Sequence, residues 1–330
     1  MKKFFLSLIV AMVTITVFAQ TSTVATLTHG DQISMFYGAF AFRDAHAAAE
    51  NGDVINLSGG AFQPTEISKA IIVRGAGVED AYPTYITGDF NVNIPSEVSD
   101  RLSFEGCRLT GAMTVQGTLN NAYFLKSYLG RINVSDESNF VNGMFVNCQV
   151  YAMDLRGNSG VQFINSYVEN FVNNGESTAT AAFMNCTIQV PEGRNANYMP
   201  SSEFTNCILF FIGPNWGYSD YAIPATSSTM NCLAVGEADY DHAFDHIQSK
   251  QNCQTLAGMD IFQDSDPMKD LTEEAKGKYL GTDGTPIGMY GGIMPFNMIP
   301  SYPRITKMNV ANKTTADGKL SVEIEVSAEK

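Results

Sequence analysis

The chain has 330 residues, of which 45% are hydrophobic and 16% charged, and its formal net charge is −14. The hydrophobic content is ample for a packed core, which excludes an intrinsically disordered chain. The negative charge argues against a nucleic-acid partner, and against polyanionic glycans such as pectate or alginate unless calcium bridges the two. We therefore predict no cofactor, with calcium as the one alternative.

The first 19 residues are typical of an export signal. Lys2 and Lys3 precede an apolar run from Phe4 to Phe18, and a small-residue cleavage site lies before Gln20. This run is short for a membrane span and nothing later in the chain approaches one, so we expect no membrane span. We predict an exported protein that is periplasmic, on the cell surface or extracellular.

A short amphipathic helix is predicted over residues 42–51. Its apolar residues recur at helical spacing, at Phe42, Ala45, Ala48 and Ala49. A helix in this place would cap the open edge of the first coil of a repeat fold. The segments 54–57, 66–74 and 85–94 are then predicted to form the first, less regular coils.

One short pattern recurs through the middle of the chain. Its aromatic position falls at Phe104, Phe124, Phe145, Phe163, Phe183 and Phe204. The five steps from Phe104 to Phe204 cover 100 residues, so the mean period is 20 residues. Two weaker copies follow at Asn231-Cys232 and Asn252-Cys253. A fixed period of this length indicates a solenoid.

Each copy consists of a strand, a tight corner and a second strand. Two apolar positions two residues apart point to one face of a strand, and a second such pair follows. One extra residue between the two pairs interrupts the alternation, which indicates a turn between two strands. The residues at this turn position tolerate a left-handed backbone; they are Gly106, Asn147, Asn165, Asn185, Asn206, Asn231 and Asn252. Stacked coils should therefore align the Phe residues in one column and the Asn residues in a hydrogen-bonded ladder.

We predict an all-β protein, a right-handed single-stranded parallel β-helix of about eight coils. The expected organisation is a signal peptide over 1–19, the β-helix with its N-terminal capping helix over 20–297, and a linker with a β-hairpin over 298–330. Paired helices would need a longer repeat, and the Leu-x-x-Leu-x-Leu frame of leucine-rich repeats is absent.

Two further segments carry a resemblance to a known family. The stretch FRDAHAAAENGDVINLSGGAF (residues 42–62), together with the Asn-lined corner, resembles the pectate-lyase-like β-helix superfamily. The stretch LTEEAKGKYLGTDGTPIGMYGG (residues 271–292) is similar to the C-terminal segment of uncharacterised secreted bacterial β-helix proteins. The resemblance covers roughly residues 40–297 and implies the fold, but it implies no particular function.

The C-terminal part is predicted to contain two features. Residues 271–297 are expected to close the far end of the helix. Residues 305–310 and 319–326, joined through Ala316-Asp317-Gly318, are predicted to form a hairpin that lies along the flank or forms a small appendage.

The six cysteines fit a core role better than a disulfide framework. Ser127 and Ser166 occupy the same slot in other coils, which indicates a slot for a small buried side chain. One bridge within the group Cys186, Cys207, Cys232 and Cys253 is nevertheless an alternative, because stacking would bring neighbours into range.

Catalytic candidates are sparse. Lyases of this fold need carboxylates for calcium together with an Arg or Lys base on adjacent coils. The nearest approach to such a cluster is Lys126, Arg131, Asp154 and Arg156. Motifs of pectate lyases and polygalacturonases are absent, so we lean away from an enzyme.

Two other groups attract a functional interpretation. His242 and His246, with Asp245 between them, have the spacing of metal ligands on a helix, although a solvated helical insertion accounts for them better. An aromatic excursion contains Trp216, Tyr218 and Tyr221 with Asn215 and Asp220 as hydrogen-bonding partners for a sugar; the simpler interpretation is that the rings pack on the flank.

Three functions are therefore weighed. The leading hypothesis is a monomeric exported β-helix that binds a polysaccharide or surface glycoconjugate, or acts in adhesion, without catalysis. The alternatives are a polysaccharide lyase or glycoside hydrolase, and a purely structural surface protein.

Overall fold

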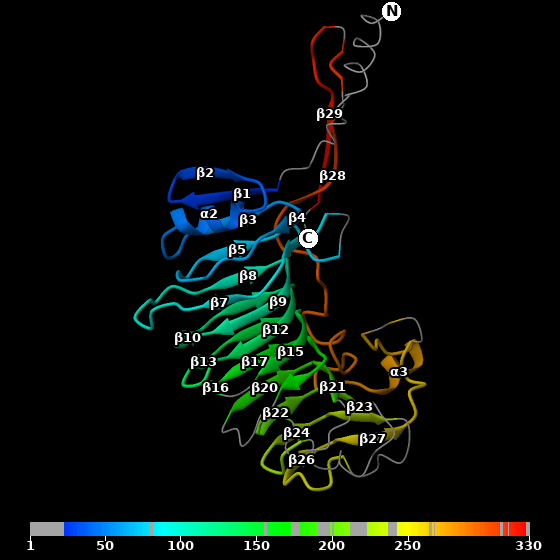
Figure 1. Cartoon of the computed structure of the whole chain (residues 1–330). Helices are drawn as coiled ribbons and strands as arrows, with labels where there is room; N and C mark the ends of the chain where they lie inside the picture. The colour runs from blue at the N-terminus through cyan, green and yellow to red at the C-terminus, as the bar shows by residue number, and fades with distance from the viewer. Residues whose placement is uncertain are drawn as a thin grey trace, which may run out of the picture.

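The chain folds into a mostly β, parallel β-solenoid of about eight turns with very little helix, as the sequence predicts (Figure 1). The computed structural model describes residues 23–79, 82–154, 157–172, 179–190, 199, 201–211, 223–236, 243–263, 266, 268–310, 313–315 and 317–327, of which residues 172 and 304–310 are described by their backbone alone. The predicted signal peptide lies outside these residues and stays a prediction.

Two 12-stranded sheets form the body. We call them sheet A and sheet B. In spatial order, sheet A contains β2 (Gln32–Tyr37), β1 (Val24–His29), β3 (Val54–Leu57), β5 (Ile72–Arg74), β8 (Ser103–Glu105), β11 (Tyr123–Leu125), β14 (Met144–Val146), β17 (Val161–Ile164), β20 (Thr180–Met184), β22 (Ser201–Thr205), β24 (Ser228–Met230) and β26 (Ser249–Gln251).

In each of the regular coils a strand of sheet B follows the strand of sheet A directly after the tight corner. From the N-terminal end, sheet B contains β4 (Gly60–Phe62), β6 (Thr84–Ile86), β9 (Cys107–Val115), β12 (Tyr128–Val134), β15 (Gln149–Asp154), β18 (Tyr167–Val168), β21 (Thr187–Val190), β23 (Ile208–Phe211), β25 (Leu233–Gly236) and β27 (Gln254–Ala257), with β7 (Phe90–Val92) beside β9 and β19 (Phe171–Val172) beside β15. A third sheet has three strands, β10 (Thr118–Asn120), β13 (Asn139–Val141) and β16 (Asn158–Ser159).

The predicted phenylalanine column is confirmed. Phe124, Phe145 and Phe163 are fully buried, and their ring centroids lie 4.9 and 4.7 Å apart with nearly parallel planes. The column continues through Phe183 to Phe204 with spacings of 4.8 and 5.0 Å. Parallel pairing fixes this register, since each Phe lies opposite the next one in neighbouring strands of sheet A.

The asparagine corner also forms where the sequence predicts it. Asn147, Asn165, Asn185, Asn206, Asn231 and Asn252 all have φ between 45° and 57°. Direct amide bonds link only part of the row: Asn231 donates to the Oδ1 of Asn206 over 3.2 Å, and Asn252 donates to Asn231. Asn165 instead donates to the carbonyls of Met289 and Gly291, over 2.8 and 2.6 Å.

These bonds reveal an error in the predicted path of the C-terminal part. Residues 271–297 do not close the far end. The chain from residue 279 to residue 302, here called the return segment, runs back along the asparagine corner toward the N-terminal end (Figure 1). It starts beside Asn231, which donates to the Leu280 carbonyl over 2.7 Å, and ends at Tyr302, whose hydroxyl donates to the Glu105 carbonyl over 3.0 Å. The corner amides need partners, and the return segment supplies them.

The cysteine slot is a buried corner position filled by thiol or hydroxyl. Each side chain donates to the carbonyl two residues earlier, as Ser166 does to Ile164 over 2.9 Å and Cys207 does to Thr205 over 3.3 Å. All six cysteines are free, five are buried, and burial raises the pKa of Cys148 to about 12. The core interpretation is confirmed, and no bridge links the last four cysteines.

A helix and a hairpin cap the N-terminal end. The predicted helix is α2 (Ala41–Ala48), which buries Phe42 and Ala45. Sequence reasoning missed the hairpin of β1 and β2, of which β1 pairs antiparallel with the first coil strand β3. At the other end of the chain, β28 (Arg304–Val310) and β29 (Val322–Ser327) form the predicted hairpin, which projects past the N-terminal end as an appendage (Figure 1).

His46 makes the cap sensitive to acid. Burial, and then the nearby Lys69, lower its pKa from 6.5 to about 4, and its Nε2 accepts from the backbone of Ser68 over 3.3 Å. The folded state therefore disfavours the proton, so the stabilisation is complete above pH 6.5 and is lost as the pH falls from 6.5 toward 4. We expect this histidine to remove about 2–3 kcal/mol of stability over that interval.

Urea unfolding at pH 7.5 and pH 4.5 checks this expectation. His46→Gln retains a polar acceptor without a titrating group, so it should lose less stability between the two pH values than the native chain does. Equal losses in both proteins would show that His46 does not titrate on unfolding.

Candidate functional site

The outer face of sheet B carries one column of aromatic and polar side chains. The strand register places one residue of each coil opposite the next, immediately after the cysteine slot. From the N-terminal end the column reads Tyr85, Arg108, Tyr128, Gln149, Tyr167, Thr187, Ile208 and Leu233. Alternation along the strands points these residues outward, because their neighbours Leu109, Leu129 and Val150 are buried in the core.

The C-terminal half of this column is covered by the chain after β27. Ile208 and Leu233 are buried together with Phe262, Leu271 and Tyr279 in a second hydrophobic cluster outside the solenoid core. We call the chain between β27 and the return segment the covering segment. It includes α3 (Glu273–Lys278), whose first turn is capped by the Thr272 hydroxyl. The N-terminal half of the column has no such cover among the described residues.

The open half presents ring faces and fixed polar groups. The Arg108 guanidinium lies 4.3 Å from the centre of the Tyr128 ring, within cation–π range. Gln149 donates to the Glu169 carboxylate over 2.8 Å, and Tyr151 is 52% exposed on the same strand as Gln149. Burial, and then Glu169, raise the pKa of Tyr128, so its hydroxyl stays protonated and can donate a hydrogen bond.

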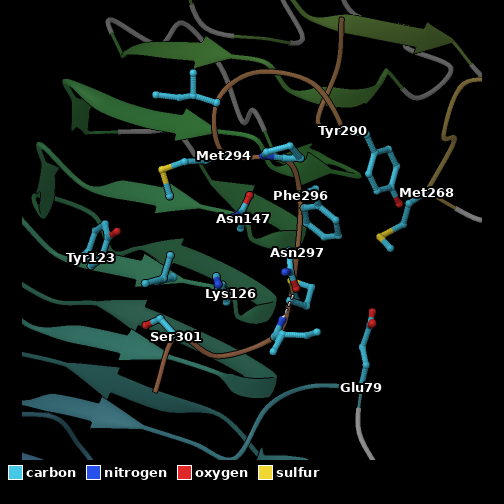
Figure 2. A pocket seen from close by; sticks show the side chains of 15 residues that line it. Glu79, Tyr123, Lys126, Asn147, Met268, Tyr290, Met294, Phe296, Asn297 and Ser301 are labelled. Carbon is cyan, nitrogen blue, oxygen red and sulfur yellow. Dashed lines mark hydrogen bonds between the residues drawn. The ribbon is translucent and has the colours of Figure 1, made fainter. Parts of the chain in front are cut away.

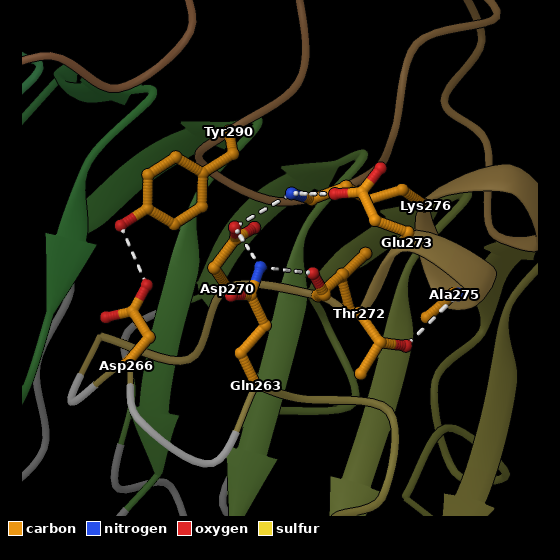
Figure 3. Close-up of polar contacts among 9 residues, drawn as sticks. Gln263, Asp266, Asp270, Thr272, Glu273, Ala275, Lys276 and Tyr290 are labelled. Atoms are coloured by element: carbon orange, nitrogen blue, oxygen red, sulfur yellow. Dashed lines mark hydrogen bonds and ion pairs between the residues drawn. The ribbon is translucent and has the colours of Figure 1, made fainter.

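A network of polar contacts fixes the covering segment beside this face (Figure 3). Lys276 forms an ion pair with Asp270 over 2.8 Å, and Gln263 donates to the same carboxylate over 2.8 Å. The Tyr290 hydroxyl donates to Asp266 over 3.1 Å, and burial, followed by Asp266, raises the pKa of Tyr290. These contacts hold the covering segment together and connect it to the return segment at one end of the open face.

A groove lies between the asparagine corner and the return segment (Figure 2). Its volume is about 860 Å³. Polar side chains line one part and apolar ones the rest, among them Glu79, Tyr123, Lys126, Asn147, Met268, Tyr290, Met294, Phe296, Asn297, Met298, Ile299 and Ser301. Asn147, with its amide nitrogen toward the acceptors, donates to the carbonyls of Asn165 and Met294 over 3.2 Å each.

The predicted catalytic candidates do not line one cavity. Lys126 is buried in the groove, in the corner slot that holds Asn in later coils, with φ of 47°. Arg131 is exposed on β12, whereas Asp154 is buried at the end of β15 and its carbonyl accepts from Asn158 over 2.9 Å. Arg156 lies outside the described residues.

The described part of the predicted metal group forms no metal site, and the predicted sugar site is not tested. Asp245 pairs with Lys250 over 3.3 Å, and a ring nitrogen of His246 lies 2.6 Å from the Ile223 carbonyl. Residues 243–246 form turns rather than the expected helix, with Ala243 and Phe244 buried, and no three His, Cys, Asp or Glu residues in the described ranges cluster to hold a metal. His242 lies outside the described part of the chain, and so do all residues of the predicted sugar site: Trp216, Tyr218 and Tyr221 with the polar Asn215 and Asp220.

Sequence reasoning missed the outward tyrosine column. Its signal is visible in the repeat, because the residue after each Cys or Ser of the slot is Arg108, Tyr128, Gln149 or Tyr167 in four successive copies. The inward Phe and Cys positions recur more regularly than the outward positions, so the repeat pattern alone does not single out the outward residues.

Comparisons with known proteins give no relative for this chain. No family model, no curated protein and no solved structure matches it. In the ranges that the structure describes, no helix has both the length and the apolar character needed to cross a membrane.

Proposed function

We propose that this protein is an exported glycan-binding β-solenoid, related to the pectate-lyase-like superfamily, that binds an extended saccharide without cleaving it. The binding surface is the open half of the outer face of sheet B. The observation that carries the proposal is the in-register column of Tyr85, Arg108, Tyr128 and Gln149, which the described residues leave half-exposed while the rest of the same column is buried.

The chemistry of this surface suits a neutral sugar chain. Tyrosine rings stack on the apolar faces of sugar rings, and their hydroxyls, with Gln149 and Glu169, offer donors and acceptors for sugar hydroxyls. Successive coils repeat about every 4.8 Å, so a linear polymer can meet the same kind of side chain several times. The net charge of −14 disfavours polyanionic glycans.

Substitution of Tyr128 tests the proposal. Tyr128→Ala should weaken binding to the best neutral polysaccharide on a glycan array by about tenfold or more, equivalent to about 1.4 kcal/mol, because it removes the ring and with it the cation–π contact that positions Arg108. Tyr123→Ala is a closely matched control: Tyr123 lies five residues earlier on sheet A, is also half-buried, and has the Arg101 guanidinium 4.7 Å from its ring centre.

The outcomes separate the three hypotheses. Equal binding by Tyr128→Ala and the native chain would reject the sheet B surface, and no binding to any glycan would favour a structural protein. Release of new reducing ends or unsaturated ends from a bound polysaccharide would replace the binding hypothesis by the lyase or hydrolase one.

A further inference from the structure

The N-terminal edge of sheet A is an unpaired apolar strand. In the described part of the chain, β2 pairs only with β1 and no strand lies beyond it. Three large side chains on its outer face are exposed: Ile33 by 70%, Met35 by 54% and Tyr37 by 63%. Proteins usually protect such edges with charge, and the opposite edge strand of the same sheet, β26, carries Lys250.

The cap protects only the inner face of this edge. Phe36 lies opposite Ala25 of β1 and packs against the core, whereas Ser34, opposite Leu27 on the same face, is exposed. Ile33, Met35 and Tyr37 alternate with them and lie opposite Thr28, Thr26 and Val24 on the outer face. The packing of β2 on β1 and the core therefore leaves the free backbone edge and the outer side chains of β2 accessible.

We propose that β2 pairs with β2 of a second copy of this chain, antiparallel and about a two-fold axis, which joins the two A sheets into one. In antiparallel pairing, residues that lie opposite each other share a face. A register centred on Met35 places it opposite Met35 of the second copy, and Ile33 opposite Tyr37. All six exposed apolar side chains then form one continuous surface across the axis.

The charges around β2 favour a second copy as the occupant. No residue from Gln32 to Tyr37 is charged, so two such strands meet without repulsion. The same register sets Asp31 opposite Ala39 of the second copy, close to the positive N-terminal end of α2. Arg43 of that helix is already paired with Asp44 over 3.0 Å, so the helix end supplies the attraction. A single strand pair is a small interface, so we expect a reversible dimer rather than a permanent one.

Charge substitutions at the axis test this pairing. Met35→Lys and Met35→Glu each place like charges directly opposite one another, so each variant should be monomeric, whereas their equimolar mixture should restore the dimer. Light scattering after size exclusion measures the mass, and the native chain should reach twice the monomer mass at high concentration. A native chain that stays monomeric at every concentration, as the sequence predicts, would overturn the proposal.

Cross-linking provides an independent readout. Met35→Cys should form a disulfide between two copies under mild oxidation, because Cα atoms opposite one another in an antiparallel pair lie within bridging distance. Met184→Cys is the control, since Met184 is also an outward methionine of sheet A and is 50% exposed. Equal cross-linking of both variants, or dimers of Met35→Lys alone, would also overturn the proposal.

Discussion

Replacement of Phe145 by alanine is expected to destabilise the solenoid by about 3–5 kcal/mol. The ring is fully buried, stacks on Phe124 and Phe163, and meets the edge of Phe140 at 6.0 Å. Each coil is stabilised mainly by its two neighbours, so a cavity in the middle of the column weakens two interfaces at once. Urea unfolding followed by circular dichroism measures the loss.

Met184→Ala is the control for this variant. Met184 lies on the same sheet but points outward and is 50% exposed, so its loss should change stability by about 0.5 kcal/mol or less. Hydrogen exchange should show the loss of protection in the Phe145 variant centred on β11, β14 and β17. Similar stabilities for the two variants would contradict the role of the column.

Replacement of Gly292 by alanine should detach the return segment from the asparagine corner. Gly292 has φ of +74°, and an added Cβ would lie 2.1 Å from the Nδ2 of Asn185. The clash displaces the buried Asn185 side chain or the backbone at residue 292, and either movement strains the nearby bonds from Asn165 to Met289 and Gly291. We expect residues 279–302 to lose hydrogen-exchange protection and to become sensitive to protease.

Gly284→Ala separates the clash from the cost of the left-handed backbone. Gly284 lies in the same segment with φ of +79°, but an added Cβ meets nothing within 4 Å. Its substitution should therefore cost only the conformational strain, about 1–2 kcal/mol, and leave the segment attached. If both variants release the segment equally, the contact with Asn185 does not hold it in place.

The core of the fold was predictable because it depends on short-range rules. The 20-residue period aligns Phe with Phe, and Asn supplies the left-handed corner at Asn147 and its equivalents, so stacking follows from burial alone. The capping helix was predictable for the same reason, since its apolar spacing is local. The β1–β2 hairpin was missed because its outer residues Ile33, Met35 and Tyr37 are apolar and exposed, which conceals the usual alternation.

The candidate site was predictable only in part. Lys126 does line the groove, but its partners there, such as Met294 and Ser301, come from the return segment more than 160 residues later. Which outward residues of sheet B stay open depends on where the chain after β27 lies. Ile208 and Leu233 are covered and Tyr128 is not, although all three occupy the same place in the repeat.

The repeat, its period, the inward column and the asparagine corner follow from the amino-acid sequence, because each of these depends on contacts between equivalent positions of neighbouring coils. The path of the return segment, and the half of sheet B that the described residues leave open, become visible in the folded chain alone. Those features depend on contacts between a non-repeating segment and the repeat, and a periodic pattern offers many equivalent places to bind it. Two features of the repeat fix the place where this segment binds. The corner amides need hydrogen-bond acceptors, and the outward apolar residues Ile208 and Leu233 become buried beneath it.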